Sequence, residues 1–283
     1  MRVVRTVQEL RAACEAARAG GQTVGFVPTM GALHAGHLAL VDRARSECGW
    51  TVVSIFVNPT QFGPHEDLAS YPRPIEDDLR ACEDAGVDLV FHPDPAEMYP
   101  RPPATSVHVS GLTDRMEGAV RPGHFDGVCL VVTKLLNAVG ACRAYFGRKD
   151  AQQLAVVARM VADLDMPVEI VPCETVREPD GLALSSRNAY LSPEDRRRAP
   201  VLYEALSEVR ERIEAGEREA ARAIEAGLKV LHGEEVDYLD VVDPDTFEPV
   251  ELVERAVVVC GAVRLGGTRL IDNVTAIGGK GRR

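Results

Sequence analysis

Two histidines lie three residues apart in the segment PTMGALHAGHLALV, residues 28–41. On a helical turn, side chains with this spacing point to the same side, and Gly36 between them lets a ligand approach the backbone closely. A helix that begins here would present unpaired N–H groups and the positive end of its dipole, which suit a phosphate. His34 and His37 could then donate hydrogen bonds to phosphate oxygens as negative charge develops. The alternatives are two satisfied surface histidines, or a zinc site for which no third ligand is suitably spaced.

Two further segments carry cationic and hydroxyl groups that could complete a polyphosphate site. In FGRKDAQQL, residues 146–154, Lys149 stands at a helix start, where the dipole favours acids. A lysine at that position indicates a phosphate contact, although a solvated surface lysine is the alternative. The segment DGLALSSRNAYLS, residues 180–192, offers two hydroxyls and a planar cation that suit polyphosphate, or else it is a polar loop between domains. Those three groups belong to Ser185, Ser186 and Arg187.

Amide side chains follow the predicted strands directly. Asn58 and Gln61 come directly after one apolar run, and Gln152 and Gln153 supply a second amide pair. Amides cannot perform acid–base chemistry, but they can orient a carboxylate or a hydroxyl group.

An adjacent acidic pair, Asp77 and Asp78, could help to hold Mg²⁺ beside phosphates. The alternative is an exposed helix N-terminus whose acids suit its dipole. The chain has no G-x-x-x-x-G-K-[ST], no G-x-G-x-x-G after its first strand and no G-x-S-x-G, which excludes a P-loop enzyme and argues against a dinucleotide site or a nucleophile elbow.

Alternating strands and helices must position these groups. A capping box at Thr6 and Glu9 starts a first helix, which ends at Gly20–Gly21. The predicted fold class is α/β, with a Rossmann-like doubly wound parallel sheet, in which ligands bind beyond the carboxyl ends of the strands. The segments 28–37, 58–62 and 147–153 all fall there. Predicted strands cover 23–29, 51–58, 87–93, 142–147 and 167–172; predicted helices cover 36–48, 75–86, 125–140 and 150–164, and 93–104 reads as a loop.

The pattern changes after residue 175. Two charged helices are predicted at 194–216 and 217–233, followed by three strands at 236–243, 256–263 and 268–274. The sequence therefore predicts two domains, residues 1–175 and a smaller α+β C-terminal domain of residues 176–283.

Composition narrows the classes of function. The chain has 283 residues, of which 46% are hydrophobic, and a net charge of −11, which argues against a nucleic-acid surface. No apolar run approaches the roughly 20 residues that span a bilayer, and MRVVRTVQELRAAC lacks the apolar region of a secretion signal. Seven scattered cysteines indicate neither a zinc knuckle nor a disulfide framework. We therefore expect a cytoplasmic protein without nucleic-acid or membrane partners.

Six blocks of sequence together resemble one enzyme family. PTMGALHAGH, FVNPTQF, YPR with its following acidic pair, GHFDGV, FGRKDAQQ and TVREPDGLALSSRN occur in the order shown by pantothenate synthetases, the pantoate–β-alanine ligases. The resemblance is dense over residues 23–192 and looser beyond. The wider nucleotidyltransferase superfamily shares only H-x-G-H and a weaker second signature, here LSSR.

The resemblance implies a two-step ligation by a cytoplasmic homodimer with a C-terminal lid. Pantoate attacks the α-phosphorus of ATP, which Mg²⁺ accompanies, to give pantoyl adenylate and pyrophosphate; β-alanine then releases pantothenate and AMP. His37 corresponds to the proton donor, and His34, Lys149, Ser185, Ser186 and Arg187 assist. ATP contacts fall on Met30, Gly31, Ala32, Leu33, His34, Ala35, Gly36, His37, Gly147, Arg148, Lys149, Asp150, Val176, Leu184, Ser185, Ser186 and Arg187. Gln61, Gln153 and Asn58 correspond to the pantoate and β-alanine site, and Asp77 and Asp78 to the metal.

Two positions depart from the family pattern. Arg148 stands where the family usually has Glu, and Ala151 stands where an aromatic residue is common. These departures bear on nucleotide affinity rather than on reaction type. The rival hypotheses are an adenylyltransferase of the same superfamily that acts on another anionic acceptor, and a non-catalytic nucleotide-binding regulator.

Overall fold

The computed structural model describes residues 1–64 and 66–278. Within these residues the chain forms two compact units. The first contains Met1–Gly147 and Val156–Glu174, and the second contains Arg148–Ala155 together with the chain from Thr175 onward. The domain boundary expected at 175–176 stays a prediction, because packing within a unit does not measure independent folding. The assignment of Arg148–Ala155 to the second unit matters for the site.

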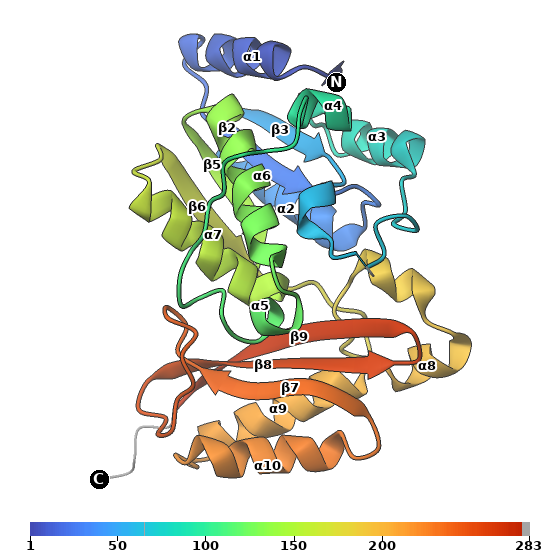
Figure 1. The fold of residues 1–283 in the computed structure, drawn as a ribbon, viewed down its shortest axis with the longest axis vertical. Helices are drawn as coiled ribbons and strands as arrows, with labels where there is room; N and C mark the ends of the chain where they lie inside the picture. The colour runs from blue at the N-terminus through green and yellow to red at the C-terminus, as the bar shows by residue number, and fades with distance from the viewer. Residues whose placement is uncertain (65, 279–283) are drawn as a thin grey trace. The chain divides into compact units, whose positions relative to one another are not determined.

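The first unit is built on a six-stranded parallel sheet with the strand order β1-β4-β3-β2-β5-β6 (Figure 1). From β2 the chain steps through β3 to β4 toward one edge, whereas β5 and β6 lie toward the other. The topological switch point, where ligands bind in such sheets, is therefore between β2 and β5. The strands are β1 (Arg2–Val4), β2 (Val24–Thr29), β3 (Trp50–Ile55), β4 (Leu89–Phe91), β5 (Cys142–Gly147) and β6 (Val168–Cys173).

Helices cover both faces of this sheet, as a doubly wound fold requires. Val27, Val53 and Val90 align in register across three strands and form one apolar core with α2 and α3. In Figure 1, α6 crosses the sheet on the side nearer the viewer. The helices and helical turns of the first unit are α1 (Val7–Ala19), α2 (Ala35–Glu47), η1 (Pro59–Gln61), α3 (Ile75–Asp84), α4 (Pro95–Met98), α5 (Glu117–Val120) and α6 (His124–Val139). After β5 follow η2 (Arg148–Asp150), which belongs to the second unit, and α7 (Ala151–Asp163), which belongs to the first unit from Val156 onward.

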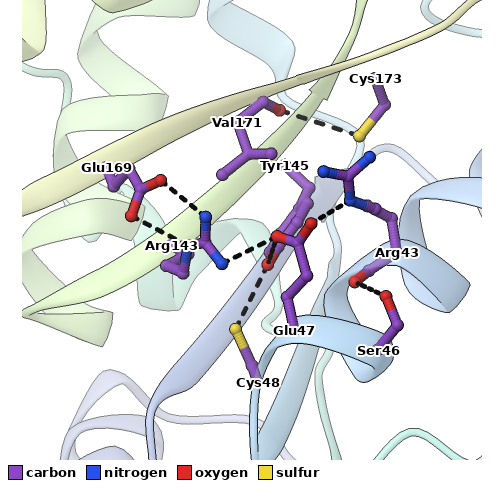
Figure 2. A network of polar contacts seen from close by, with 9 residues as sticks. All are labelled: Arg43, Ser46, Glu47, Cys48, Arg143, Tyr145, Glu169, Val171 and Cys173. Atoms are coloured by element: carbon purple, nitrogen blue, oxygen red, sulfur yellow. Dashed lines mark hydrogen bonds and ion pairs between the residues drawn. The ribbon is translucent and has the colours of Figure 1, made fainter.

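A polar network anchors the C-terminal end of α2 to the sheet (Figure 2). Glu47 accepts a hydrogen bond from the buried Tyr145 hydroxyl at 3.0 Å and pairs with Arg143 at 2.8 Å and with Arg43. Burial raises the pKa of Tyr145, so its hydroxyl stays a donor. Arg143 also forms two hydrogen bonds to Glu169, at 2.9 and 2.7 Å, which joins β5 to β6. The network fixes α2 at the end opposite to its two histidines.

The second unit packs helices against a three-stranded antiparallel sheet of order β7-β8-β9. Leu206, Ile213, Leu231 and Leu265 lie fully buried in its core. Its elements are η3 (Ser186–Tyr190), α8 (Pro193–Arg198), α9 (Val201–Glu214), α10 (Ala220–Val230), β7 (Glu235–Val242), β8 (Ala256–Leu265) and β9 (Thr268–Ile277). The predicted fold class, a Rossmann-like parallel sheet with a smaller α+β unit, is confirmed.

Three local predictions were wrong or incomplete. The single helix expected at 194–216 is two helices, because Pro200 has no N–H to continue α8, and α9 begins after it. The expected loop at 93–104 contains α4, which Pro95 opens at the position where a missing N–H costs nothing. Strand β1 has only three residues, too few to show a periodic pattern, and forms by pairing with β4.

Candidate active site

The turn between β2 and α2 is held in an unusual backbone conformation. Gly31 and Ala32 both have positive φ, +83° and +50°. For alanine this conformation costs about 1–2 kcal/mol. Asp78 of α3, which is only 2% exposed, offsets that cost by accepting the N–H groups of Ala32 at 2.9 Å and Leu33 at 2.7 Å. A side chain at Gly31 would place its Cβ 2.8 Å from the Asp78 carboxylate, so the turn requires glycine there.

This turn places the two histidines at the N-terminal end of α2. His34 is the N-cap residue, and its Nδ1 accepts the Gly36 N–H at 3.1 Å. Nδ1 of His37 accepts the His34 N–H at 3.4 Å, and the two rings lie with their centroids 4.1 Å apart. A ring nitrogen that accepts a hydrogen bond carries no proton, so the N–H of each ring is at Nε2. The backbone thereby sets both imidazoles as Nε2–H donors.

The predicted acidic pair divides between two environments. Both carboxylate oxygens of Asp78 are occupied by the backbone N–H groups of the β2–α2 turn. Asp77 is exposed and pairs with Arg80 on its own helix. Consecutive helical residues point about 100° apart, so the two carboxylates do not share one face. The structure gives Asp78 a positioning role, and the assignment of both residues to Mg²⁺ stays a prediction.

The amide predicted at Asn58 is buried and fully engaged within the first unit. Its Nδ2 donates to Gln61 Oε1 at 3.0 Å and to the Gly127 carbonyl at 3.1 Å. Its Oδ1 accepts the Tyr99 hydroxyl at 2.9 Å and the Thr60 hydroxyl at 3.0 Å. Asn58 is 1% exposed, so these contacts suit it to orienting Gln61 rather than to direct substrate contact.

Gln61 is held from two sides. Because Asn58 donates to its Oε1, its Nε2 group is directed toward Met30, at 3.2 Å from the sulfur. Helix α6 approaches η1 so closely that a Cβ at Gly127 would lie 2.1 Å from the Thr60 carbonyl oxygen. Met30 and Gln61, which the sequence places 31 residues apart, are therefore brought together beyond neighbouring strands.

A partly buried histidine fixes the backbone of the same turn. His124 Nδ1 donates to the Gln61 carbonyl at 2.8 Å, and its Nε2 accepts from Arg121 at 3.1 Å. Arg121 in turn forms hydrogen bonds to Glu66 at 2.6 and 2.7 Å. Burial, together with the charge of Arg121, lowers the pKa of His124 from 6.5 to about 4. His124 is therefore a neutral link between Arg121 and Gln61.

The remaining candidate residues lie in the second unit. Lys149 is half-buried and lies 3.4 Å from Asp150. Ser185 caps η3, its hydroxyl accepting the Arg187 N–H at 3.3 Å, and the Leu184 N–H donates to the Val176 carbonyl at 3.0 Å. Arg148, Gln153 and Ser186 belong to the same unit. By contrast, residues 30–37, Asn58, Gln61, Asp77, Asp78 and Gly147 belong to the first unit.

Sequence reasoning missed a group of residues that support these loops. Tyr99, Arg121 and His124 brace η1, while Arg177, Asp272 and Asn273 brace the second-unit loops. The GHFDGV block contains His124, but its spacing does not reveal which carbonyl it contacts. Asp272 and Asn273 fell in a predicted strand where only the apolar alternation was informative.

Comparison with known proteins gives one consistent result. Residues 2–275 match the family model described as pantoate-beta-alanine ligase. The pantothenate synthetase of Thermotoga neapolitana is 51% identical over 276 residues, which cover 96% of this chain and 99% of the relative. That of Koribacter versatilis is 50% identical over 277 residues, covering 97% and 95%.

The chain belongs to the pantoate–β-alanine ligase family.

Solved structures agree with this assignment. The pantothenate synthetase of Thermus thermophilus is 54% identical with a TM-score of 0.91, and the match covers 97% of this chain and 99% of that one. A Francisella tularensis pantoate-beta-alanine ligase, solved with beta-gamma ATP and β-alanine, is 31% identical with a TM-score of 0.80 and 97% coverage of both chains. The chain is thus an enzyme, a ligase, as the resemblance implied.

Two structural features are absent from the described residues. No group of three or more His, Cys, Asp or Glu side chains in residues 1–64 and 66–278 is placed to hold a metal ion. None of the helices in that part of the chain is long and apolar enough to cross a membrane.

Asp78 and its neighbour Asp77 offer a matched pair of substitutions. Asp78→Asn replaces one acceptor oxygen with an NH₂ group that faces a backbone N–H. We expect it to lower the free energy of unfolding by about 1–3 kcal/mol, whereas Asp77→Asn should change it by less than about 0.5 kcal/mol. Urea denaturation of both variants measures the difference. Equal effects would show that Asp78 does not hold the β2–α2 turn.

The lowered pKa of His124 predicts a specific pH dependence of stability. Between the unfolded pKa of 6.5 and the folded pKa of about 4, the unfolded chain binds a proton that the folded protein excludes. The free energy of unfolding should therefore fall as the pH decreases through that window. Between about pH 7 and about pH 5, His124 alone should account for a loss of about 2 kcal/mol. His124→Asn removes the titration and should lose correspondingly less stability.

Urea denaturation at the two pH values measures this, with His232→Asn, at an exposed position, as the control that should follow the wild type. An unchanged pH dependence in His124→Asn would mean that His124 is not excluded from protonation.

Proposed function

We propose that this ligase joins pantoate to β-alanine to give pantothenate, using ATP and passing through pantoyl adenylate. The observation that carries the proposal is the pair of imidazoles at the start of α2, whose Nδ1 atoms accept backbone N–H groups and whose Nε2–H groups are donors. Family membership and the Francisella tularensis relative, which was solved with beta-gamma ATP and β-alanine, support the same reaction.

In the first step a pantoate carboxylate oxygen bonds to the α-phosphorus of ATP, and the bond to the pyrophosphate oxygen breaks. Negative charge grows on the leaving pyrophosphate, so fixed donors and cations supply most of the catalysis. We assign this role to His37, as the proton donor, with His34, Lys149, Ser185, Ser186 and Arg187. The wider ATP contacts are those that the resemblance implies: residues 30–37, residues 147–150, Val176 and residues 184–187.

In the second step the β-alanine nitrogen bonds to the acyl carbon of the adenylate. The bond from that carbon to the AMP oxygen breaks, AMP leaves, and the amine loses a proton. We assign pantoate binding to Gln61 and Gln153, with Asn58 acting through Gln61. Because Gln61 is oriented by the buried Asn58 and by Met30, it can hold a substrate oxygen in one geometry with little further loss of entropy on binding.

Mg²⁺ enters this proposal only with ATP. Asp77 and Asp78 do not share one face of α3, and their assignment to Mg²⁺ stays a prediction. The steps above therefore run through the protein's own donors. The homodimer and the cytoplasmic location implied by the family resemblance remain predictions.

The reaction is tested by single-turnover release of pyrophosphate from ATP. We expect release to require pantoate, and formation of AMP and pantothenate to require β-alanine as well. His37→Ala should slow pyrophosphate release about 10²–10³-fold, because it removes a donor aimed at developing charge. The exposed His232→Ala is the matched control and should keep the wild-type rate.

Two results would contradict the proposal. An absence of pyrophosphate release with pantoate, together with release when another anionic acceptor is supplied, would favour an adenylyltransferase with another acceptor. Tight ATP binding without any turnover would favour a regulator. A near-normal rate in His37→Ala would remove that residue from the mechanism.

A further inference from the structure

A polar pair in the middle of β9, Asp272 and Asn273, contacts two separate loops of the second unit. Asn273 lies in β9, opposite Cys260 of β8. Its Nδ2 donates to the carbonyl oxygens of Arg148 and Lys149, at 2.8 Å each, across more than 120 residues of sequence. An amide NH₂ group has two hydrogens, so both are used on the backbone of η2.

The two carbonyls lie on either side of one Cα atom. The Arg148 carbonyl belongs to the peptide plane that precedes the Lys149 Cα, and the Lys149 carbonyl belongs to the plane that follows it. Peptide planes are rigid, so orienting both fixes φ and ψ of Lys149. Those two angles set the direction of the Cα–Cβ bond, and with it the direction in which the lysine side chain leaves the backbone.

The neighbouring Asp272 supports Asn273 and reaches the other loop. Asp272 is 6% exposed and accepts the Asn273 N–H at 2.7 Å. It also accepts two hydrogen bonds from Arg177, at 2.5 and 3.0 Å. Arg177 follows Val176, which is assigned to ATP, and its guanidinium stacks on the Tyr203 ring at 4.2 Å from the centroid.

Arg177 donates two further hydrogen bonds, both to backbone carbonyls. It donates to the Gly181 carbonyl at 3.0 Å and to the Asn273 carbonyl at 3.1 Å. The segments 148–150 and 176–181 are therefore tied to one strand, although they are distant in sequence.

We propose that Asn273 is a positioning residue for Lys149, fixing the backbone from which that lysine reaches the nucleotide. This inference rests on the proposed ATP-dependent reaction. Asn273 itself touches neither substrate nor reacting atoms in this account. Asp272 and Arg177 hold Asn273 in register and couple the Lys149 turn to the loop that begins at Val176.

The test is a double-mutant cycle on the full chain, measured as single-turnover pyrophosphate release from ATP and pantoate. Asn273→Ala removes both donors and should slow release about 10–100-fold, the range expected when a catalytic group is displaced by about an ångström. In a Lys149→Ala background the same substitution should change the rate by less than about twofold, because the group that it positions is already missing.

Two companion variants keep the result interpretable. Asn273→Asp keeps the shape of the side chain but cannot donate hydrogen bonds to the two carbonyls. It is measured in parallel as a folded variant that lacks the donors. Thr275→Ala alters an exposed residue two positions along the same face of β9 and should keep the wild-type rate.

The outcomes separate this inference from the proposed function. A wild-type chain without pantoate-dependent release would overturn the proposed function. A Lys149→Ala variant at the wild-type rate would remove Lys149 from the mechanism and the positioning role of Asn273 with it. With both of those as expected, additive effects of Asn273→Ala and Lys149→Ala would overturn the positioning role alone, as would a wild-type rate in folded Asn273→Asp.

Discussion

One buried carboxylate determines the geometry at the start of α2. Asp78 accepts the N–H groups of Ala32 and Leu33 and so stabilises two successive left-handed residues after β2. That turn places His34 as the N-cap. The Gly36 N–H then donates to Nδ1 of His34, and the His34 N–H donates to Nδ1 of His37. A charged group without partners would be costly to bury, so Asp78 and the turn stabilise each other. The direction of both histidine donors follows from this contact.

The second unit uses the same physical device. Asp272 is buried, pairs with Arg177 and accepts a backbone N–H from Asn273, whose amide then holds the carbonyls around Lys149. In the first unit the buried acid binds the backbone of the loop directly, whereas in the second unit Asp272 holds Asn273, whose amide binds the backbone of the loop. Each loop presents a side chain assigned to phosphate. Catalysis by fixed donors needs such preorganisation, since a donor that must reorient when charge develops contributes less.

Local patterns in the sequence were sufficient to predict most of the fold. The capping box at Thr6, the apolar runs that became β2 and β3, and the antiparallel strands at the C-terminus are signals within a few residues, and the structure confirms them. Contacts between distant segments could not be predicted from the sequence. Asp77 and Asp78 look alike in sequence, and only the rotation of α3 sends one to the turn and the other to solvent. The two hydrogen bonds from Asn273 span more than 120 residues, and no local pattern indicates them.

The central claim is that the backbone sets His34 and His37 as Nε2–H donors. Nitrogen-15 NMR of the histidine-labelled protein measures directly which ring nitrogen carries the proton. The account predicts an unprotonated Nδ1 and a protonated Nε2 in both rings, with that preference weakened in the Asp78→Asn variant as the turn relaxes. A protonated Nδ1 in either ring of the wild-type protein would contradict it.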